Sequence, residues 1–166
     1  MSKEQENPRA HLLRLLQSFK TAMLVTRRGD GHLRARPLSL ATQHDDEVLY
    51  FATAIDSPKV DEISHAPDVL VTLQGAASYI SISGTATISR DPALIDRLWS
   101  EPWRVWFPRG KEDPALCIVV VTPSEAEYWD QSGAKGLKYL LGMAKAYATG
   151  TTPESGGSSD NAKVRL

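Results

Sequence analysis

Short runs of apolar and β-branched residues follow one another along the chain, separated by glycine, proline and polar turn signals. The run over residues 79–88 alternates along its whole length and holds Gly84 in its middle, which is typical of a bulge or bend in a strand. Short connections between such runs favour hairpins and meanders. The pattern predicts a mainly β protein with short helices at the junctions. The expected strands are residues 21–26, 32–38, 47–53, 68–74, 79–88, 115–122 and, as a last edge strand, 126–130.

Three prolines mark the starts of helices between these strands. Each follows a residue that caps a helix well, in the pairs Asn7–Pro8, Ser57–Pro58 and Asp91–Pro92. About seven short strands in mostly antiparallel order would leave exposed edges if they formed an open sheet. A small barrel removes those edges, so we expect the strands to close into a barrel with flanking helices.

The length and composition of the chain favour a single domain. Its 166 residues are 42% hydrophobic, which is enough for one sizeable core. From Thr149 onward the composition changes to a polar, Gly- and Ser-rich stretch that cannot bury a core. We therefore expect one domain over residues 1–148 and a disordered tail over residues 149–166.

The charge and hydropathy of the chain argue against two classes of partner. The 19 basic and 20 acidic residues are spread along the chain and leave a net charge of −1, without the basic footprint of a nucleic-acid-binding protein. The N-terminal residues 1–8 are charged, and no window approaches the ~18 apolar residues of a membrane span. We expect a cytoplasmic protein that binds neither nucleic acid nor membrane.

Cysteine and histidine chemistry is not expected to supply a catalytic or metal centre. Cys117, the single cysteine, lies in an apolar run and predicts a buried core thiol, because its neighbours offer no base or cation. The histidines are scattered without metal-ligand spacing, so no metal site is expected. No motif nominates a catalytic side chain, and the catalytic residues stay unknown. The four histidines are His11, His32, His44 and His65.

Two polar groups, each following a strand-like run, look like the walls of an anion site. Ser57 caps a helix, and with Lys59 in the first turn it offers a hydroxyl, backbone N–H groups, a positive helix end and a cation to one phosphate. Arg34 and Arg36 lie two apart on a strand and point to one face, next to Pro37, which removes a backbone N–H. Taken separately, each group has a simpler explanation. The first is also typical of an ordinary helix start, and the second of a strand face that is exposed to solvent. Their combination favours a phosphate site.

An aromatic segment follows the third helix. Three of the four tryptophans fall within eight residues. Trp99 and Trp103 have helical spacing and are expected in the core. Trp106 and Phe107 stand next to Pro108, where they are better placed to cover a ring system by stacking.

The order of these segments resembles the pyridoxamine 5′-phosphate oxidase-like split barrels. Within that family the chain is most similar to the general stress protein 26 branch of FMN-binding proteins. The likeness extends over about residues 7–132. Its motifs are Arg-Ala-Arg-Pro-Leu at residues 34–38, Leu-Tyr-Phe-Ala-Thr at 49–53, Ser-Pro-Lys at 57–59, Tyr-Ile-Ser-Ile-Ser-Gly-Thr-Ala at 79–86 and Trp-Phe-Pro at 106–108.

The resemblance implies a homodimeric split β-barrel with FMN sites at the subunit interface. Arg36, Pro37 and Leu38 would run beside the isoalloxazine ring, and Ser57 and Lys59 would hold the phosphate. Three further groups complete the implied site: Phe51, Ala52 and Thr53 along the ribityl chain, Gln74 near the flavin, and Trp106 and Phe107 from a flanking loop or from the partner subunit.

The resemblance leaves the activity open. True pyridoxamine phosphate oxidases carry an Arg-Lys pair after the serine, and Pro58 replaces that arginine here, which argues against vitamin B6 oxidation. The favoured hypothesis is an FMN-binding general stress protein that acts as a weak flavin-dependent oxidoreductase with a nicotinamide donor. The alternatives are a non-enzymatic flavin binder or sensor, and a split barrel that binds the deazaflavin F420 or haem.

Overall fold

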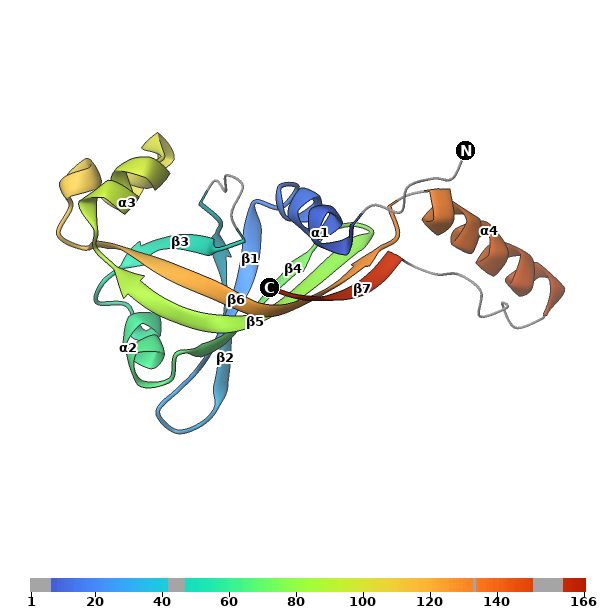
Figure 1. Ribbon diagram of the computed structural model, residues 1–166, viewed down its shortest axis with the longest axis horizontal. Helices are drawn as coiled ribbons and strands as arrows, with labels where there is room; N and C mark the ends of the chain where they lie inside the picture. Colours follow the sequence, from blue (N-terminus) through green and yellow to red (C-terminus); the bar gives the residue numbers. More distant parts are fainter. Residues whose placement is uncertain (1–6, 42–46, 133, 151–159) are drawn as a thin grey trace.

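The framework of the protein is a seven-stranded sheet with short helices at its junctions (Figure 1). The computed structural model describes residues 7–41, 47–132, 134–150 and 160–166. The elements are α1 (Pro8–Leu16), β1 (Thr21–Arg27), β2 (Leu33–Ser39), β3 (Leu49–Ala54), α2 (Pro58–His65), β4 (Asp68–Gln74), β5 (Ser78–Ser89), α3 (Pro92–Leu98), η1 (Glu101–Val105), η2 (Gly110–Glu112), β6 (Leu116–Asp130), α4 (Ala134–Thr149) and β7 (Asp160–Arg165).

The sheet curls so that its two end strands face each other. The strand order is β2-β1-β4-β5-β6-β3, with β7 added to β6, and neighbouring strands pair antiparallel. β2 and β3 stand at opposite ends of this order and still approach each other in space. We call the line along which they face each other the β2–β3 seam. The predicted barrel of about seven mostly antiparallel strands with flanking helices is confirmed, and it is split along this seam.

The ladder between β5 and β6 carries the curl of the sheet. Its register shifts at Ser83/Gly84, where β6 contributes one extra residue, Ser124. A Cβ atom on Gly84 would overlap the carbonyl oxygen of Thr122 and lie 2.9 Å from the Cα of Pro123. The bend predicted at Gly84 is therefore confirmed, and its cause is the close approach of two backbones.

β6 differs from the prediction. The sequence favours two strands, residues 115–122 and 126–130, because Pro123 and two polar residues interrupt the apolar run. The structure forms one continuous strand, Leu116–Asp130, since Pro123 falls at the register shift, where the ladder is already irregular. Its second half pairs with β5 on one side and β7 on the other, so the prediction of an edge strand at residues 126–130 is wrong.

The C-terminal part of the chain contains two elements that sequence reasoning did not expect. α4 follows β6, and residues 160–165 of the predicted disordered tail form β7 instead. β7 pairs along β6 and packs Val164 into the core at 8% exposure, which explains why a segment with so few apolar residues is held. Residues 151–159 of that tail lie outside the described residues.

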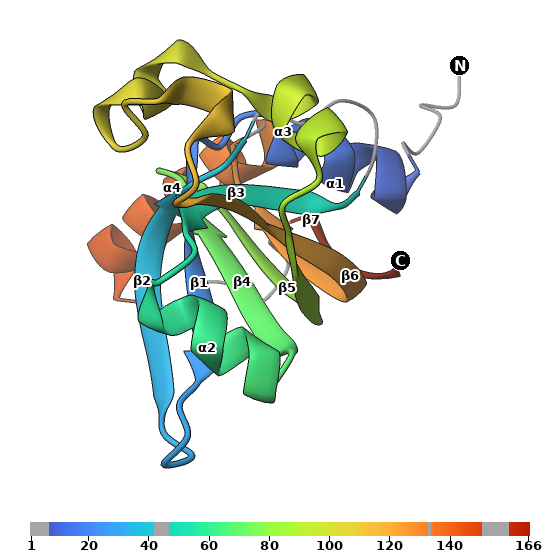
Figure 2. The ribbon, with the colours of Figure 1, turned by 90° about the vertical axis from the view of Figure 1, so that its left-hand side faces the viewer.

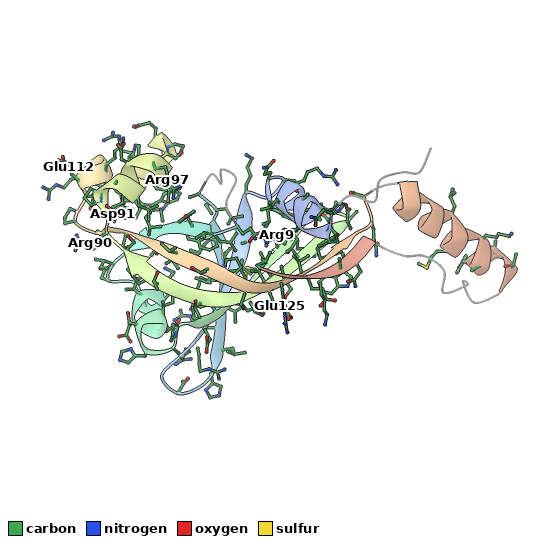
Figure 3. The ribbon with its side chains drawn as sticks, in the orientation of Figure 1. Arg9, Arg90, Asp91, Arg97, Glu112 and Glu125 are labelled. Atoms are coloured by element: carbon green, nitrogen blue, oxygen red, sulfur yellow. The ribbon has the colours of Figure 1, made fainter. Side chains whose placement is uncertain are left out.

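The buried side chains form two clusters on the two faces of β3 and the first half of β6. The barrel interior holds one cluster, in which Phe51 and Val119 face residues of β1, β4 and β5. The second lies between these strands and the α3–η2 segment, and contains Tyr50, Trp103 and Phe107. Arg97 of α3 (Figure 3) donates a hydrogen bond of 3.1 Å to the Tyr50 hydroxyl at its edge. The predicted core position is confirmed for Trp103, and Trp99 packs against the same cluster while partly buried.

α2 closes one end of the barrel. It packs against β1 and β5 and buries Ile63 to 2% exposure in the interior cluster (Figure 2). The helix begins at Pro58 after Ser57, as predicted, and its first turn follows β3 directly. The start of α2 therefore lies next to the end of β3, beside the β2–β3 seam.

Replacing Gly84 by alanine is expected to lower the free energy of unfolding by about 2 kcal/mol, because backbone atoms of β6 occupy the space of the new methyl group. Urea unfolding followed by tryptophan fluorescence measures the change. Gly29→Ala is the matched control, since a Cβ there meets no atom within 4 Å. Equal effects of the two substitutions would contradict the bulge as the point of close approach.

Candidate functional site

The end of β3 and the start of α2 bring together the predicted phosphate-binding side chains. Lys59 donates a hydrogen bond of 2.8 Å from Nζ to Oγ1 of Thr53. The hydroxyl oxygens of Thr53 and Ser57 lie 3.5 Å apart. Ser57 makes no side-chain capping bond to α2, although it is the N-cap residue. Two hydroxyls and one ammonium group thus converge at the N-terminal end of a helix, where anions are favoured.

The charged side chain of Lys59 is partly removed from solvent. Its burial lowers the pKa of the ammonium group, and the neighbouring charges of Arg36 and Arg34 lower it further. Cys117 and Glu62 act in the opposite direction, with effects smaller than those of burial and Arg36 but larger than that of Arg34. An anion at this position would therefore stabilise the charged form of Lys59, which has lost part of its contact with water.

Cys117 lies directly behind this group and is inert. Its thiol is fully buried, and Sγ donates to the backbone carbonyl of Thr53 at 3.4 Å. Burial raises the pKa of the thiol to about 11. The prediction of a core thiol is confirmed, since the thiolate that nucleophilic chemistry needs does not form at neutral pH.

A second group of polar side chains joins α2 to β1 and β2. Arg36 donates from Nη2 to Oε2 of Glu62 at 2.7 Å and from Nη1 to the hydroxyl of Thr26. Thr26 donates to the same carboxylate oxygen of Glu62. Arg34 places Nη1 3.8 Å from the other oxygen, with half of its side chain exposed. We call Thr26, Arg34, Arg36 and Glu62 the Glu62 cluster.

The electrostatics of the Glu62 cluster favour a charged carboxylate. Burial alone would raise the pKa of Glu62, but hydrogen bonds from Thr26 and Arg36 and the charges of both arginines outweigh it and hold that pKa below its usual value. Arg34 and Arg36 face one carboxylate, and Lys59 lies near enough to interact with all three. Three cations and one anion thus surround the start of α2.

The remaining predicted site residues differ in how far they are buried. Leu38 and Ala52 are partly buried against the two core clusters, and Phe51 is fully buried, so its backbone is the part that faces the seam. Pro37 is exposed on β2, the end strand of the sheet, where proline costs no ladder hydrogen bond. Gln74 ends β4 and is exposed.

The two aromatic residues of the predicted lid differ in exposure. Trp106 follows η1 with 67% of its surface exposed. Phe107 is 5% exposed and packs with Tyr50 and Trp103. Its ring is therefore part of the core of this chain, and of this pair only Trp106 exposes most of its side chain to solvent.

Sequence reasoning missed Glu62 and Thr26. Each looks like an ordinary position of its own element, one on a helix after the predicted cap and one at the end of a strand. Only the packing of α2 against β1 brings them together.

A family model described as pyridoxamine 5′-phosphate oxidase like matches residues 7–154. The chain belongs to this family. Proteins named general stress protein 26 are among its relatives, as the sequence motifs predict.

Three relatives in the pyridoxamine 5′-phosphate oxidase-like family illustrate the likeness. General stress protein 26 of Bacillus subtilis (strain 168) is 29% identical over 127 residues, which are 73% of this chain and 87% of that protein. A crystal structure of a general stress protein 26 from Jannaschia sp. CCS1 matches with a TM-score of 0.73 and 26% identity, over 95% of this chain and 99% of that one. The general stress FMN/FAD binding protein of Xanthomonas citri matches with a TM-score of 0.65 and 27% identity, over 75% and 89%.

The described residues contain neither a membrane-spanning helix nor a metal-binding cluster. None of the helices in the described part of the chain is long and apolar enough to cross a membrane. Within the same residues, no group of three or more His, Cys, Asp and Glu side chains is arranged to hold a metal ion.

Replacing Glu62 by alanine is expected to lower the free energy of unfolding by about 3 kcal/mol, because it leaves the largely covered charge of Arg36 without its partner. Urea unfolding measures the loss. Ser64→Ala, an exposed position on the same helix, should change stability by no more than about 0.5 kcal/mol. A loss of similar size from both would argue against the buried ion pair.

The same ion pair predicts acid sensitivity. The pKa of Glu62 is lower in the folded chain than its unfolded value of about 4.3. The stabilisation is therefore complete above that unfolded value and is lost as the pH falls through the folded pKa. The stability difference between the wild type and Glu62→Gln should shrink as the pH is lowered below about 4. A difference that stays constant down to pH 2 would contradict this assignment.

Proposed function

We propose that this chain binds FMN at the β2–β3 seam. The observation that carries the proposal is the convergence of Thr53, Ser57 and a desolvated Lys59 at the start of α2. A phosphomonoester offers several acceptor oxygens and two negative charges, which match two hydroxyls, a helix N-terminus and an ammonium group. The FMN/FAD binding protein of Xanthomonas citri, at 27% identity, supports a flavin as the ligand.

One phosphate suits this group better than two. Arg34 and Arg36 face the carboxylate of Glu62, whereas Lys59 contacts a neutral hydroxyl. The group at the start of α2 therefore has one cation that a carboxylate does not neutralise by direct contact. This favours FMN over FAD, whose diphosphate needs a longer run of donors.

The residues along the seam have distinct parts in this proposal. Ser57 and Lys59 hold the phosphate, while Thr53 and the backbone of Phe51 and Ala52 line the ribityl chain. Arg36, Pro37 and Leu38 flank the isoalloxazine ring from β2, with Arg36 held in place by Glu62. When bound, the flavin supplies the hydride and electron-transfer chemistry, and the protein supplies orientation and electrostatics.

We also propose that the protein is a homodimer. The outer face of the sheet, the side of β1, β2, β4 and β5 opposite the barrel interior, exposes apolar side chains. Met23 is 37% exposed and Tyr79 39% exposed on this face. Exposed large apolar side chains on a sheet face are candidates for a contact with another chain, and a second copy with twofold symmetry is the commonest partner.

Replacing Lys59 by alanine is expected to weaken FMN binding by about tenfold to a hundredfold, because the phosphate loses a charge-assisted hydrogen bond. Riboflavin, which lacks the phosphate, should bind the variant and the wild type about equally. Fluorescence titration of both flavins gives the two affinities.

Lys111→Ala is the matched control, because this surface lysine pairs with Asp96 on α3, away from α2. It should leave FMN affinity unchanged. The pH dependence adds a signature, since FMN affinity should fall as the pH rises through the lowered pKa of Lys59 and this dependence should vanish in the alanine variant. Equal losses for FMN and riboflavin would remove Lys59 from the phosphate site.

We further propose a weak oxidoreductase activity with a nicotinamide nucleotide as the electron donor. The FMN-loaded protein is then expected to oxidise NADH or NADPH faster than the same concentration of free FMN, measured by absorbance at 340 nm. A rate equal to that of free FMN, with the flavin retained after desalting, would favour a flavin carrier or sensor instead. Failure to retain FMN would redirect the search to deazaflavin or haem.

A further inference from the structure

The carboxylate of Glu62 lies among the three cations at the start of α2. Glu62 is buried, and it follows Lys59 by three positions, so the two side chains lie on the same side of the helix. From β2, Arg36 donates to Oε2 at 2.7 Å, and Arg34 lies 3.8 Å from Oε1. Glu62 therefore connects the helix that carries Lys59 to the two arginines of β2.

The two arginines differ in how closely they contact this carboxylate. The side chain of Arg36 is largely covered and satisfies Oε2 directly. Arg34 leaves 53% of its side chain exposed, and its distance from Oε1 exceeds that of a hydrogen bond. One carboxylate thus offsets one of the three cations, and within this group two positive charges remain in excess.

Lys59 interacts with charges of both signs from the elements around it. Arg36 and Arg34 on β2 lower the pKa of its ammonium group, whereas Cys117 on β6 and Glu62 on its own helix raise that pKa. Its direct partner on β3 is a neutral hydroxyl. The thiol of Cys117 has a pKa of about 11, so it carries no charge at neutral pH. Of these groups, Glu62 is therefore the anion that supports the charge of Lys59.

We propose that Glu62 is a positioning residue that limits the strength of the phosphate site by acting through Arg36 and Lys59. Its negative charge holds Arg36 against the barrel and favours a protonated Lys59. The same charge opposes that of an incoming phosphate, so the site attracts FMN less strongly than three unopposed cations would. This inference rests on the FMN binding proposed above, because it concerns the same phosphate site.

Glutamine at position 62 removes the charge and keeps the shape of the side chain. Its carbonyl oxygen can replace Oε2 and accept the hydrogen bonds of Arg36 and Thr26. Its NH₂ group then replaces Oε1, to which Arg34 makes no hydrogen bond. Glu62→Asp is the counterpart, because it keeps the charge on a shorter side chain. An effect of charge should appear in Glu62→Gln and be absent from Glu62→Asp.

The titration of Lys59 tests the electrostatic role of Glu62 without a flavin. Lysine labelled with ¹³C is incorporated into the full chain, and Lys59→Arg identifies the NMR signal of Lys59. The midpoint of its titration is expected to move to lower pH in Glu62→Gln and to higher pH in Arg34→Gln, since each variant removes one of the charges that act on Lys59.

Asp61→Asn is the matched control for this titration. It removes the same charge from the same helix, but the side chain of Asp61 is 80% exposed, so solvent screens its charge. The midpoint for Lys59 should stay in place in this variant. An unchanged midpoint in Glu62→Gln would overturn the proposal.

The ratio of FMN affinity to riboflavin affinity tests the effect on the phosphate. Both flavins share the ring system, so the ratio cancels changes in the rest of the site. At neutral pH this ratio is expected to rise about threefold to tenfold in Glu62→Gln, and to stay within about twofold of the wild type in Glu62→Asp and Asp61→Asn. A ratio that falls or stays unchanged in Glu62→Gln would overturn the proposal.

These outcomes separate the role of Glu62 from FMN binding itself. A wild-type chain that binds FMN no better than riboflavin removes the phosphate site, while the titration of Lys59 still decides the electrostatic role. FMN binding with no rise of the ratio in Glu62→Gln removes this inference alone. Should urea unfolding show that Glu62→Gln does not fold, the half-exposed variant Arg34→Gln decides, and a midpoint that does not rise there contradicts the proposal.

Discussion

The long ladder between β5 and β6 is the constraint on which the other features depend. It joins the half of the sheet that contains β1, β2 and β4 to the strand β3, and its register shift at Gly84 lets the two halves bend toward each other. The absence of a side chain at Gly84 permits the backbone of Thr122 to approach. Without this bend the end strands β2 and β3 would lie far apart in an open sheet, and no seam would form between them.

The candidate site follows from how α2 is fixed at that seam. Glu62 is held by Thr26 and Arg36 from β1 and β2, so one buried carboxylate ties the helix to the opposite side of the barrel. This contact sets where the first turn of α2 points. It also absorbs the charge of Arg36, which leaves Lys59 as a partly desolvated cation with a hydroxyl for its neighbour. Stability and the proposed anion binding are therefore coupled through a single helix.

Much of this arrangement could be predicted from local patterns, and the failures have physical causes. Ser57 and Pro58 identify the helix start because capping is a local interaction, and the spacing of Arg34 and Arg36 gives their shared face because strand geometry has a period of two. Phe107 was expected to stack on a ring system beside Trp106, and the structure instead buries its ring in the core, since proximity to a proline in sequence does not reveal which side of a loop is buried. The prediction divided β6 at Pro123. A proline fits inside a strand only where the ladder is irregular, and this irregularity arises from the contact with Gly84 on β5, which the sequence of β6 does not reveal.

The sequence by itself determined strands β1 to β5, the starts of α1, α2 and α3, the family, and the pairing of Ser57 with Lys59 at one helix start. These features rest on interactions between residues close in the chain. The tertiary structure alone decided which polar side chains neutralise one another. Glu62 meets Arg36 across 26 positions of sequence, and Thr26 joins them from a third element. It also decided that residues 160–165 form β7 and that α4 stands apart from the barrel. Such pairings depend on how distant segments are brought together. Burial then gives the few matching charges and hydrogen bonds a large effect on which arrangement is stable.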